Sequence, residues 1–341
     1  MELVSVIMPT YNRAALIGDA IQSVLDQTYD RLDLLLIDDG STDNTENIIS
    51  QFNDPRLKYV RQENKGAAAA RNHGLALRTG AYVAFIDSDD IWFPEKLELE
   101  IEVMKTLPEV GVVCSDFSSI DEAGNSERSH LRSYFSVLND YGLRYEDVFN
   151  NILAKELARL DKAEKVYWGD IYETMLFGNI ILTSTSLFRK EVFDKVGYFD
   201  TKYVTLEDYD FFLKVAKIFP VALIDKPLIR YRYNSIQLSG ELFFGRLCEN
   251  LIEIFKKNIE SIRGSNLYKA NKVKIRRRLG AYFAQYGYYY FAQENTTAAA
   301  KHCFQSIKLN PTLYRSYLYC LFCLLPIGFS KVIRKMKKLA G

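Results

Sequence analysis

Short apolar runs alternate with segments of helical periodicity over the first 90 residues of the chain. Four runs rich in branched and aromatic apolar residues are typical of strands, and they cover residues 3–8, 32–39, 57–62 and 81–86. The segments between them repeat apolar or small residues at helical spacing, and they cover residues 13–27, 41–52 and 66–80. This alternation predicts an α/β fold with a mostly parallel sheet and helices on both of its faces.

Polar residues gather directly after three of the predicted strands. The stretch PTY (9–11) follows the first strand, DD (38–39) ends the second, and DSDD (87–90) follows the fourth. The carboxyl ends of parallel strands share one edge of a sheet, and ligands bind beyond that edge. The sequence therefore predicts an acid-rich rim, made of these three stretches, as the ligand site.

The stretch DSDD places three carboxylates within four residues. Like charges this close repel one another unless a cation joins them, and carboxylate oxygens suit Mg²⁺ or Mn²⁺. These ions take one or two carboxylates together with substrate phosphates. A second interpretation stays open from this stretch alone, because acidic residues often cap a helix and a helix is expected to begin near Pro94.

Motifs in a fixed order resemble those of family-2 glycosyltransferases with the GT-A fold, of the type that builds bacterial surface glycans. They lie between about residues 3 and 235 and read VSVIMPTYNR, LLIDDGSTDNT, NKGAAAARNHGL, YVAFIDSDD and LEDYDFFLKVA. The resemblance implies a nucleotide-diphospho-sugar transferase fold with a Rossmann-like sheet. It also implies an inverting, metal-dependent enzyme that moves a sugar from a nucleotide donor to an acceptor hydroxyl.

The resemblance also implies roles for the residues that match these motifs. The expected donor-binding residues are Pro9, Thr10, Tyr11, Asp39, Arg71, Asp87 and Ser88. Asp87 and Asp89 are the expected ligands of Mn²⁺ or Mg²⁺, with Asp89 binding the ion directly. Asp208 falls where the family has its catalytic base, beside Glu207, although this pair alone also fits the exposed first turn of a helix. Asp38 is expected to cap the next helix while Asp39 binds.

These residue types suit transfer from a nucleotide sugar. The departing diphosphate carries negative charge, which a metal held by acids stabilises. A carboxylate within hydrogen-bond reach can take the proton of the acceptor hydroxyl as it attacks. One base on the face opposite the leaving group gives inversion in a single displacement, without a second carboxylate as nucleophile.

Residues 168–200 resemble the acceptor side of the family, where Asn179 and residues 183–186 are expected to approach the acceptor or the donor sugar. The stretch 121–127 is expected to form a turn, and the 140s to 160s a helix of mixed charge. Asn234 stands near the position where the family often has a histidine. The chain has no Q-x-x-R-W motif, which argues against a processive polysaccharide synthase.

Charge divides the chain into two parts. Residues 1–260 hold 29 Lys+Arg and 42 Asp+Glu, whereas residues 261–341 hold 15 Lys+Arg and only one acid. A part this basic usually meets an anionic partner. The apolar stretch 317–329, too short to span a bilayer, and the five basic residues of SKVIRKMKK predict attachment to an anionic membrane surface. The alternative is a helix packed against the catalytic domain.

We expect three regions. Residues 1–115 are the nucleotide-sugar-binding half of the GT-A domain, 116–238 its acceptor-side half, and 239–341 a helical extension with the basic, membrane-associating tail. Residues 279–311 resemble one tetratricopeptide unit, with an ordinary helical hairpin as the alternative. The aromatic stripe in 282–290 is expected to be core or interface rather than a sugar platform. The C-x-x-C at 320–323 is expected to be apolar helix packing rather than a zinc site.

The composition also indicates a cellular compartment. The sequence shows no signal-peptide pattern and no apolar run of 18 residues, and its five cysteines suit a reducing compartment. We therefore expect a cytoplasmic protein. The family resemblance, together with the basic tail, implies that it is peripheral at the inner face of the cell membrane and acts on a lipid-linked glycan in surface-polysaccharide assembly. The alternative is a catalytically silent sugar-nucleotide-binding or scaffold protein. No RNA-binding motif and no Gly-rich phosphate loop are present, which argues against nucleic acid as a partner and against a nucleotidyltransferase.

Overall fold

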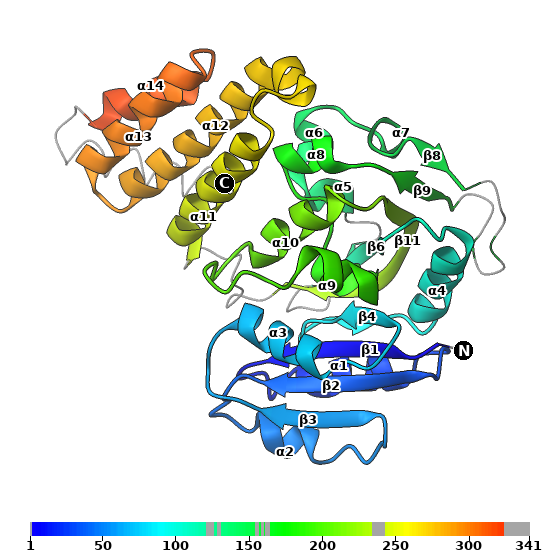
Figure 1. The fold of residues 1–341 in the computed structure, drawn as a ribbon. Coiled ribbons are helices and arrows are strands. Elements are labelled where there is room, and N and C mark those ends of the chain that lie inside the picture. Colours follow the sequence, from blue (N-terminus) through cyan, green and yellow to red (C-terminus); the bar gives the residue numbers. More distant parts are fainter. Residues whose placement is uncertain are drawn as a thin grey trace. The chain divides into compact units, whose positions relative to one another are not determined.

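The computed structural model of the chain describes residues 2–120, 126–127, 131–153, 157, 160, 164–233 and 243–323. The chain forms two compact units, Met1–Ser235 and Ile236–Gly341. The first unit contains the sheet and its helices, and the described part of the second unit is helical (Figure 1).

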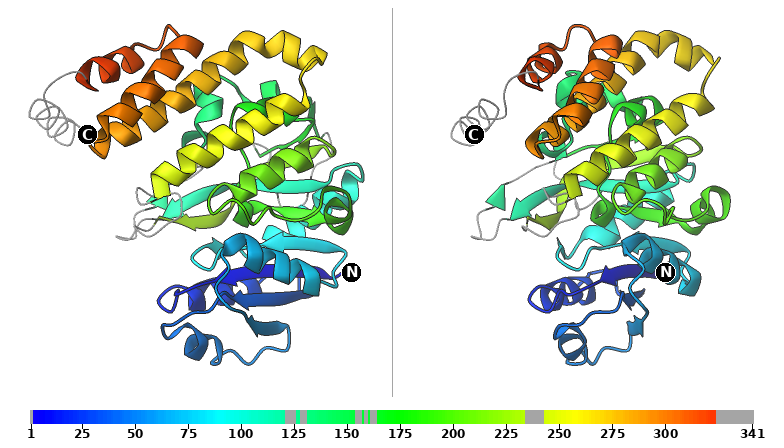
Figure 2. Two further views of the ribbon diagram at one scale, coloured as in Figure 1. Left: turned by 60° about the vertical axis from the view of Figure 1, so that its left-hand side comes forward. Right: turned by 90° about the vertical axis from the view of Figure 1, so that its left-hand side faces the viewer.

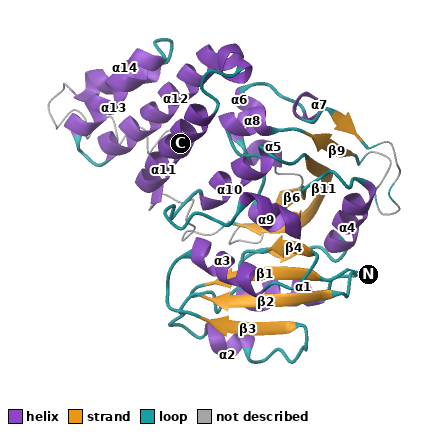
Figure 3. Cartoon of the chain, viewed as in Figure 1, coloured by secondary structure: helices purple, strands orange, loops and turns teal. Residues whose placement is uncertain are grey.

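Four parallel strands form the N-terminal part of the sheet, in the order β3-β2-β1-β4. They are β1 (Val4–Thr10), β2 (Leu32–Asp38), β3 (Leu57–Arg61) and β4 (Tyr82–Phe85). Every residue of β1, β2 and β4 is buried, which explains why the sequence shows runs of apolar residues there instead of alternation. The carboxyl ends of β2 and β3 lie at the same edge (Figure 3).

The rest of the sheet is mixed. Beyond β4 the order continues β10-β6-β11-β9-β8, with β10 antiparallel to both of its neighbours and β6 parallel to β11. These strands are β10 (Leu187–Arg189), β6 (Val112–Ile120), β11 (Val221–Arg232), β9 (Val166–Gly169) and β8 (Asn151–Ile152). Two short strands pair antiparallel beside this path, β5 (Ile91–Trp92) with β11 and β7 (Ser126–Glu127) with β6. The expected parallel arrangement thus describes the N-terminal strands and the β6–β11 pair.

All three helices expected between the first four strands are present. They are α1 (Ile17–Leu25), α2 (Thr45–Ile49) and α3 (Ala67–Leu77). Helix α2 is much shorter than the predicted segment because residues 41–43 instead hold the loop after β2, where Asn12 Oδ1 accepts a hydrogen bond from Thr42 N at 2.8 Å. The helix expected near Pro94 is α4 (Lys96–Thr106).

The prediction of one mixed-charge helix in the 140s to 160s is wrong. The described residues there form α7 (Tyr145–Val148) and β8, preceded by α6 (Ser136–Asp140). The turn after α6 contains Gly142 at φ 62, a conformation that suits glycine and interrupts a helix. The turn expected at 121–127 lies mostly outside the described residues. The remaining helices of this unit are α5 (Leu131–Tyr134), α8 (Tyr172–Phe177), the 3₁₀ helix η1 (Thr183–Thr185), α9 (Lys190–Val196) and α10 (Glu207–Ala216).

Four helices make up the described part of the second unit: α11 (Phe244–Ser261), α12 (Asn266–Ala292), α13 (Thr296–Leu309) and α14 (Tyr314–Cys323). Helices α12 and α13 run side by side in both views of Figure 2. They approach closely at Gly287, where an added Cβ would lie 2.6 Å from Cys303 Sγ. Residues 279–311 therefore form a helical hairpin, and α14 packs on it.

The aromatic stripe and the C-x-x-C both take part in packing within the second unit. Tyr282 and Phe283 are buried, and Tyr282 meets Phe255 edge-on at 5.3 Å between ring centroids. Cys320 and Cys323 pack against a core cluster made of Phe291, Ala299, Cys303 and Tyr319. Over the described ranges of the chain, no helix is long and apolar enough to cross a membrane.

Candidate active site

The loops after β1 and β2 are joined into one edge of the rim. Asp39 N donates to Thr10 O at 2.8 Å, and Asn12 N donates to Ser41 Oγ at 2.9 Å. Asn12 adopts φ 50, a left-handed conformation that asparagine tolerates better than most residues. The stretches PTY and DDGS, far apart in sequence, therefore lie together as the sequence predicts.

Asp38 holds the turn after β2 and does not cap α2. Its Oδ1 accepts a hydrogen bond from Ser41 N and its Oδ2 one from Tyr59 OH, both at 2.8 Å. The side chain that binds the first residue of α2 is Asp43, whose Oδ1 accepts from Thr45 N at 3.0 Å. The expectation that Asp38 caps the helix is thus wrong, because its carboxylate is already satisfied within the turn.

Asp39 fixes the loop that leads into α3. Its Oδ1 accepts from Lys65 N at 2.9 Å and from Gln62 Nε2 at 2.7 Å, and its Oδ2 accepts from Gly66 N at 2.7 Å. Gly66 precedes the first residue of α3 and has φ 88, which favours glycine. Asp39 therefore sets where α3 starts, and with it the position of Arg71 one turn further on.

Arg71 connects the end of β4 to the start of α10. Its Nη2 donates to Asp87 Oδ1 at 2.7 Å and its Nη1 donates to Glu207 Oε1 at 2.6 Å. The side chains of Arg71 and Glu207 are 6% and 7% exposed, whereas that of Asp87 is 32% exposed. These two ion pairs hold Arg71, Asp87 and Glu207 together, and all three are predicted site residues.

The acids at the start of α10 are not an exposed first turn. Leu206, directly before them, adopts φ 64 and ψ 17, a strained conformation for a branched side chain. Asp208 Oδ2 accepts from the Thr183 hydroxyl at 3.3 Å. Burial raises the pKa of Glu207, the Arg71 charge opposes this, and the Asp208 carboxylate adds to it. Burial likewise raises the pKa of Asp208 against the opposing charge of Arg71.

The DSDD stretch forms a turn that several distant residues hold in place. Asp90 N donates to Asp87 O at 3.0 Å, and Asp87 N donates to Ser184 Oγ at 3.0 Å. Asp89 Oδ2 lies 3.6 Å from Arg13 Nε, and Arg232 Nε donates to Asp89 O at 3.0 Å.

Asp90 is fully buried and accepts a hydrogen bond from Arg232 N at 3.1 Å. Burial raises the pKa of Asp90, and the charges of Asp89 and Asp87 add to the effect. Strand β5 separates the turn from α4, which begins without a side-chain cap. The helix-cap interpretation of this stretch is therefore wrong.

The other predicted donor-binding residues at the rim differ in how far they are buried. Pro9 and Thr10 end β1, where both are buried, while Tyr11 is 43% exposed. Ser88 is buried within the turn.

Thr183 and Ser184 reach the site residues, but Asn179 closes a local turn, since its Oδ1 accepts from Ile181 N at 3.1 Å. The hydroxyls of Thr185 and Ser186 bind backbone oxygens of their own segment. Asn234 lies outside the described residues.

Sequence reasoning missed Arg13 and Arg232. Arg13 ends the motif VSVIMPTYNR and Arg232 lies two residues before Asn234, but the sequence assigned a role to neither of them. Their partners lie 76 and 143 residues away in the sequence, and no local pattern encodes such pairs. The sequence also did not predict the hydrogen bond that Trp92 Nε1 donates to Ser184 O at 2.9 Å.

Comparison with known proteins identifies the family of the domain that holds the N-terminal part of this site. Residues 5–166 match the family model "Glycosyl transferase family 2". The chain therefore contains a glycosyltransferase domain of this family. It is 28% identical over 263 residues to glycosyltransferase GlyG of Streptococcus pneumoniae, covering 76% of this chain and 80% of that protein. It is also 50% identical over 103 residues to WfgD of Escherichia coli, a "UDP-Glc:alpha-D-GlcNAc-diphosphoundecaprenol beta-1,3-glucosyltransferase", covering 30% and 41% of the two chains.

Solved structures share the fold. TarS 1–349 of S. aureus in complex with UDP-GlcNAc superposes with a TM-score of 0.60 at 17% identity, covering 94% of this chain and 88% of that one. The mannosyltransferase PcManGT of Pyrobaculum calidifontis, in complex with GDP-Man and Mn²⁺, gives a TM-score of 0.56 at 19% identity, covering 93% and 78%. The family 2 domain therefore has the GT-A fold. The chain spans only 36% of the length of an uncharacterized Rickettsia felis glycosyltransferase that it matches at 28% identity over 70% of its own length.

The rim offers ligands that fit a divalent ion in a family 2 domain. Asp87 and Asp89 present hard oxygen donors, and their side chains are 32% and 13% exposed. Within the described ranges, no group of three or more His, Cys, Asp or Glu could hold a metal by itself. An ion at this turn would therefore take the rest of its ligands from phosphate and water, as Mg²⁺ commonly does.

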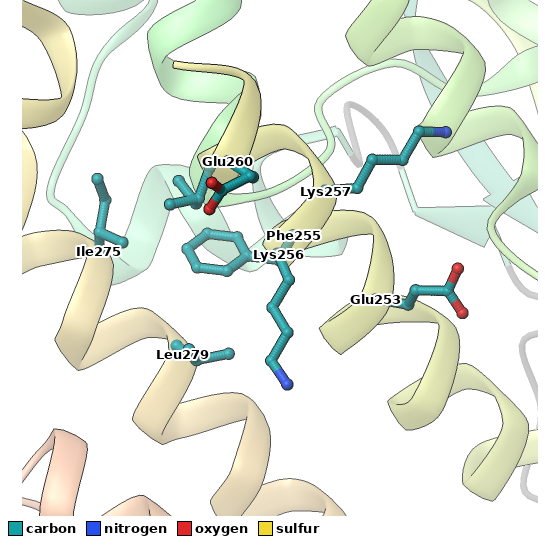
Figure 4. Close-up of a pocket in the computed structure, with 8 residues that line it drawn as sticks. Glu253, Phe255, Lys256, Lys257, Glu260, Ile275 and Leu279 are labelled. Atoms are coloured by element: carbon teal, nitrogen blue, oxygen red, sulfur yellow. The ribbon is translucent and has the colours of Figure 1, made fainter. Parts of the chain in front are cut away.

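A groove in the second unit lies between α11 and α12 and contains none of the predicted site residues. Its volume is about 460 Å³. The ring of Phe255 points toward Ile275 and Leu279, while Lys257 and Glu253 point away from them (Figure 4). Both signs of charge line this groove, so it shows no preference for an anionic ligand.

Replacing Arg71 by Met tests the central ion pairs of the site. The change leaves Glu207 buried without its cation, so we expect the free energy of unfolding in urea to fall by about 3–5 kcal/mol. The control is Arg263→Met, which breaks an exposed pair with Glu260 and should cost less than about 1 kcal/mol. Adding Glu207→Gln to Arg71→Met should recover part of the loss. Equal effects of the two arginine changes would contradict the interpretation.

Proposed function

We propose that this chain is an inverting glycosyltransferase that moves one sugar from a nucleotide-diphosphate-sugar to an acceptor hydroxyl. The observation that carries the proposal is the buried Arg71, which joins Asp87 at the end of β4 to Glu207 at the start of α10. It brings the carboxylates proposed for the departing diphosphate close to Asp208, the carboxylate proposed for the acceptor. The S. aureus neighbour bound to UDP-GlcNAc supports a nucleotide-sugar as donor.

Asp208 is the proposed base. Its raised pKa, caused by burial, makes the carboxylate a better proton acceptor than an exposed aspartate would be. The Thr183 hydroxyl holds Oδ2, and Tyr209 N donates to Oδ1 at 2.7 Å, so the carboxylate is oriented before an acceptor arrives. Glu207 remains paired with Arg71, which leaves Asp208 as the side chain that takes the acceptor proton.

The donor is proposed to bind along the rim. We assign the nucleotide to Pro9, Thr10, Tyr11 and Asp39, and the diphosphate to Arg71, Asp87 and Ser88. Asp87 and Asp89 would hold Mn²⁺ or Mg²⁺, which would stabilise the negative charge of the leaving group. Thr10 Oγ1 supports a ligand here, because it is buried without a hydrogen-bond partner among the described residues.

The acceptor is proposed to be a lipid-linked glycan in bacterial surface-polysaccharide assembly. The name of WfgD gives a diphosphoundecaprenol-linked sugar as that enzyme's acceptor. A relative in Bacillus subtilis, 48% identical over 105 residues that cover 30% of this chain and 42% of that protein, is described as a putative teichuronic acid biosynthesis glycosyltransferase. We propose residues 1–115 as the donor half, 116–238 as the acceptor half and 239–341 as an extension that reaches the membrane.

Replacing Asp208 by Asn tests the base. Asparagine keeps the shape but cannot accept a proton, so turnover should fall by roughly 10²–10⁴-fold while donor binding survives. Turnover is measured with a panel of nucleotide-sugars, and binding by thermal shift with the same panel. Near-normal turnover of the variant would exclude Asp208 as the base. A natural chain that binds a donor but never turns it over would indicate a silent binding protein instead.

Chelation tests the metal. Transfer should stop in EDTA and return with Mn²⁺ or Mg²⁺, and Asp89→Ala should weaken metal-dependent nucleotide binding. Calorimetric titration of Mn²⁺ in the presence of a nucleoside diphosphate measures this binding directly, without turnover. Glu98→Ala, an acidic residue of α4 outside the turn, serves as the control. Full activity in EDTA would refute the metal proposal.

We propose that the C-terminal segment attaches the protein to the anionic inner face of the cell membrane. The sequence supports this, because residues 330–338 carry five basic residues and no acid. Each Lys or Arg near such a surface contributes about 1 kcal/mol. Attachment would raise the encounter rate with an acceptor that is itself confined to the membrane.

Ending the chain after Cys323 tests this attachment. Cutting before α14 would remove Tyr319 from the core of the second unit, whereas a cut after Cys323 keeps this core. We expect a folded, donor-binding protein that sediments at least tenfold less with vesicles containing phosphatidylglycerol. Equal sedimentation of the shortened and the natural chain would contradict a role for residues 324–341.

A further inference from the structure

Helix α14 has two faces of different character. On one face Ser316 and Tyr319 are buried against the α12–α13 hairpin. The hydroxyls of Ser316 and Ser306 lie 2.7 Å apart, and the rings of Tyr319 and Phe291 are 5.7 Å apart between centroids. This face fixes the rotation of the helix, so its other face is defined as well.

The other face is apolar and exposed. It carries Tyr314, Tyr317, Leu318 and Leu321, whose exposed fractions are 63%, 45%, 43% and 54%. These positions follow the i, i+3, i+4, i+7 spacing of one helical stripe, which we name the α14 stripe. A stripe of large apolar side chains facing water is unfavourable unless something covers it, and contiguous exposed apolar surface commonly marks an interaction site.

The charge around the α14 stripe selects what can cover it. From residue 295 to the end, the chain holds eight Lys+Arg and no Asp or Glu. Arg315 lies within α14 and is exposed, as are Lys301 and Lys308 on α13. A second copy of the chain would bring like charges together, whereas an anionic lipid surface offers both negative headgroups and an apolar layer beneath them.

We infer that the α14 stripe lies in the headgroup region of an anionic membrane, with the helix parallel to the surface. The leucines enter the apolar boundary, and the tyrosines place their rings there with their hydroxyls toward water. The inference rests on the proposed membrane attachment and adds a folded, rigid contact to the basic segment that follows. It gives the second unit one defined side that faces the membrane.

A pair of matched double variants tests the α14 stripe in the full chain. Leu318→Ser with Leu321→Ser removes apolar groups that are 43% and 54% exposed. The control, Leu77→Ser with Ile218→Ser in the first unit, removes groups that are 41% and 52% exposed. Because all four side chains already face water, both variants should fold, which circular dichroism and thermal unfolding verify.

Binding to vesicles of phosphatidylglycerol and phosphatidylcholine should weaken at least tenfold in the stripe variant and less than twofold in the control. Pure phosphatidylcholine should bind the natural chain weakly. The inference is overturned if the stripe variant binds like the control. It is also overturned if the natural chain ignores anionic vesicles, or if sedimentation velocity shows that the stripe variant loses a self-association of the natural chain.

Vesicle binding and donor turnover together distinguish the membrane attachment, the α14 stripe contact and the glycosyl transfer from one another. If the chain ending at Cys323 loses vesicle binding while the stripe variant keeps it, the attachment stands and the stripe inference fails. Donor turnover with a water-soluble acceptor should be unchanged in the stripe variant, so loss of vesicle binding leaves the proposed glycosyl transfer untouched.

Discussion

The architecture of the rim depends on one buried guanidinium. The two terminal nitrogens of Arg71 donate hydrogen bonds to Asp87 and Glu207. Asp87 follows a parallel strand, and Glu207 starts a helix 120 residues later. Removing such charges from water costs free energy, and only close, well-oriented partners offset this desolvation penalty. The ion pairs therefore act as a specificity constraint, since a sheet in any other register would leave the arginine or an acid buried alone.

The same constraint explains the strain beside it. Leu206 occupies a left-handed conformation, which costs of order 1–3 kcal/mol for a non-glycine residue. This turn lets Glu207 face Arg71 while Asp208 faces Thr183. Two adjacent carboxylates thus receive different partners, one an arginine and the other a hydroxyl and a backbone amide. Their different surroundings are a physical basis for giving them different roles.

The sequence predicted what local patterns encode. Buried parallel strands appear as apolar runs, and the polar stretches after them predicted the rim with Asp87, while the family resemblance singled out Arg71. Three kinds of feature could not be predicted. Pairs such as Arg13 with Asp89 join residues 76 positions apart, so no periodicity reveals them. Asp38 is satisfied by Tyr59 from the neighbouring strand β3. The two faces of α14 depend on the rotation that tertiary packing imposes.

An acid-rich rim would repel an anionic donor, and arginine side chains offset part of this negative charge. Three arginines, Arg13, Arg71 and Arg232, contact the same turn and helix start as the acids. Burial raises the pKa of both Asp90 and Glu207, although the Arg71 charge opposes the shift at Glu207. The rim therefore carries less net negative charge than its acids alone would give it. A divalent ion bound at Asp87 and Asp89 would add positive charge at this turn, where a diphosphate would bind.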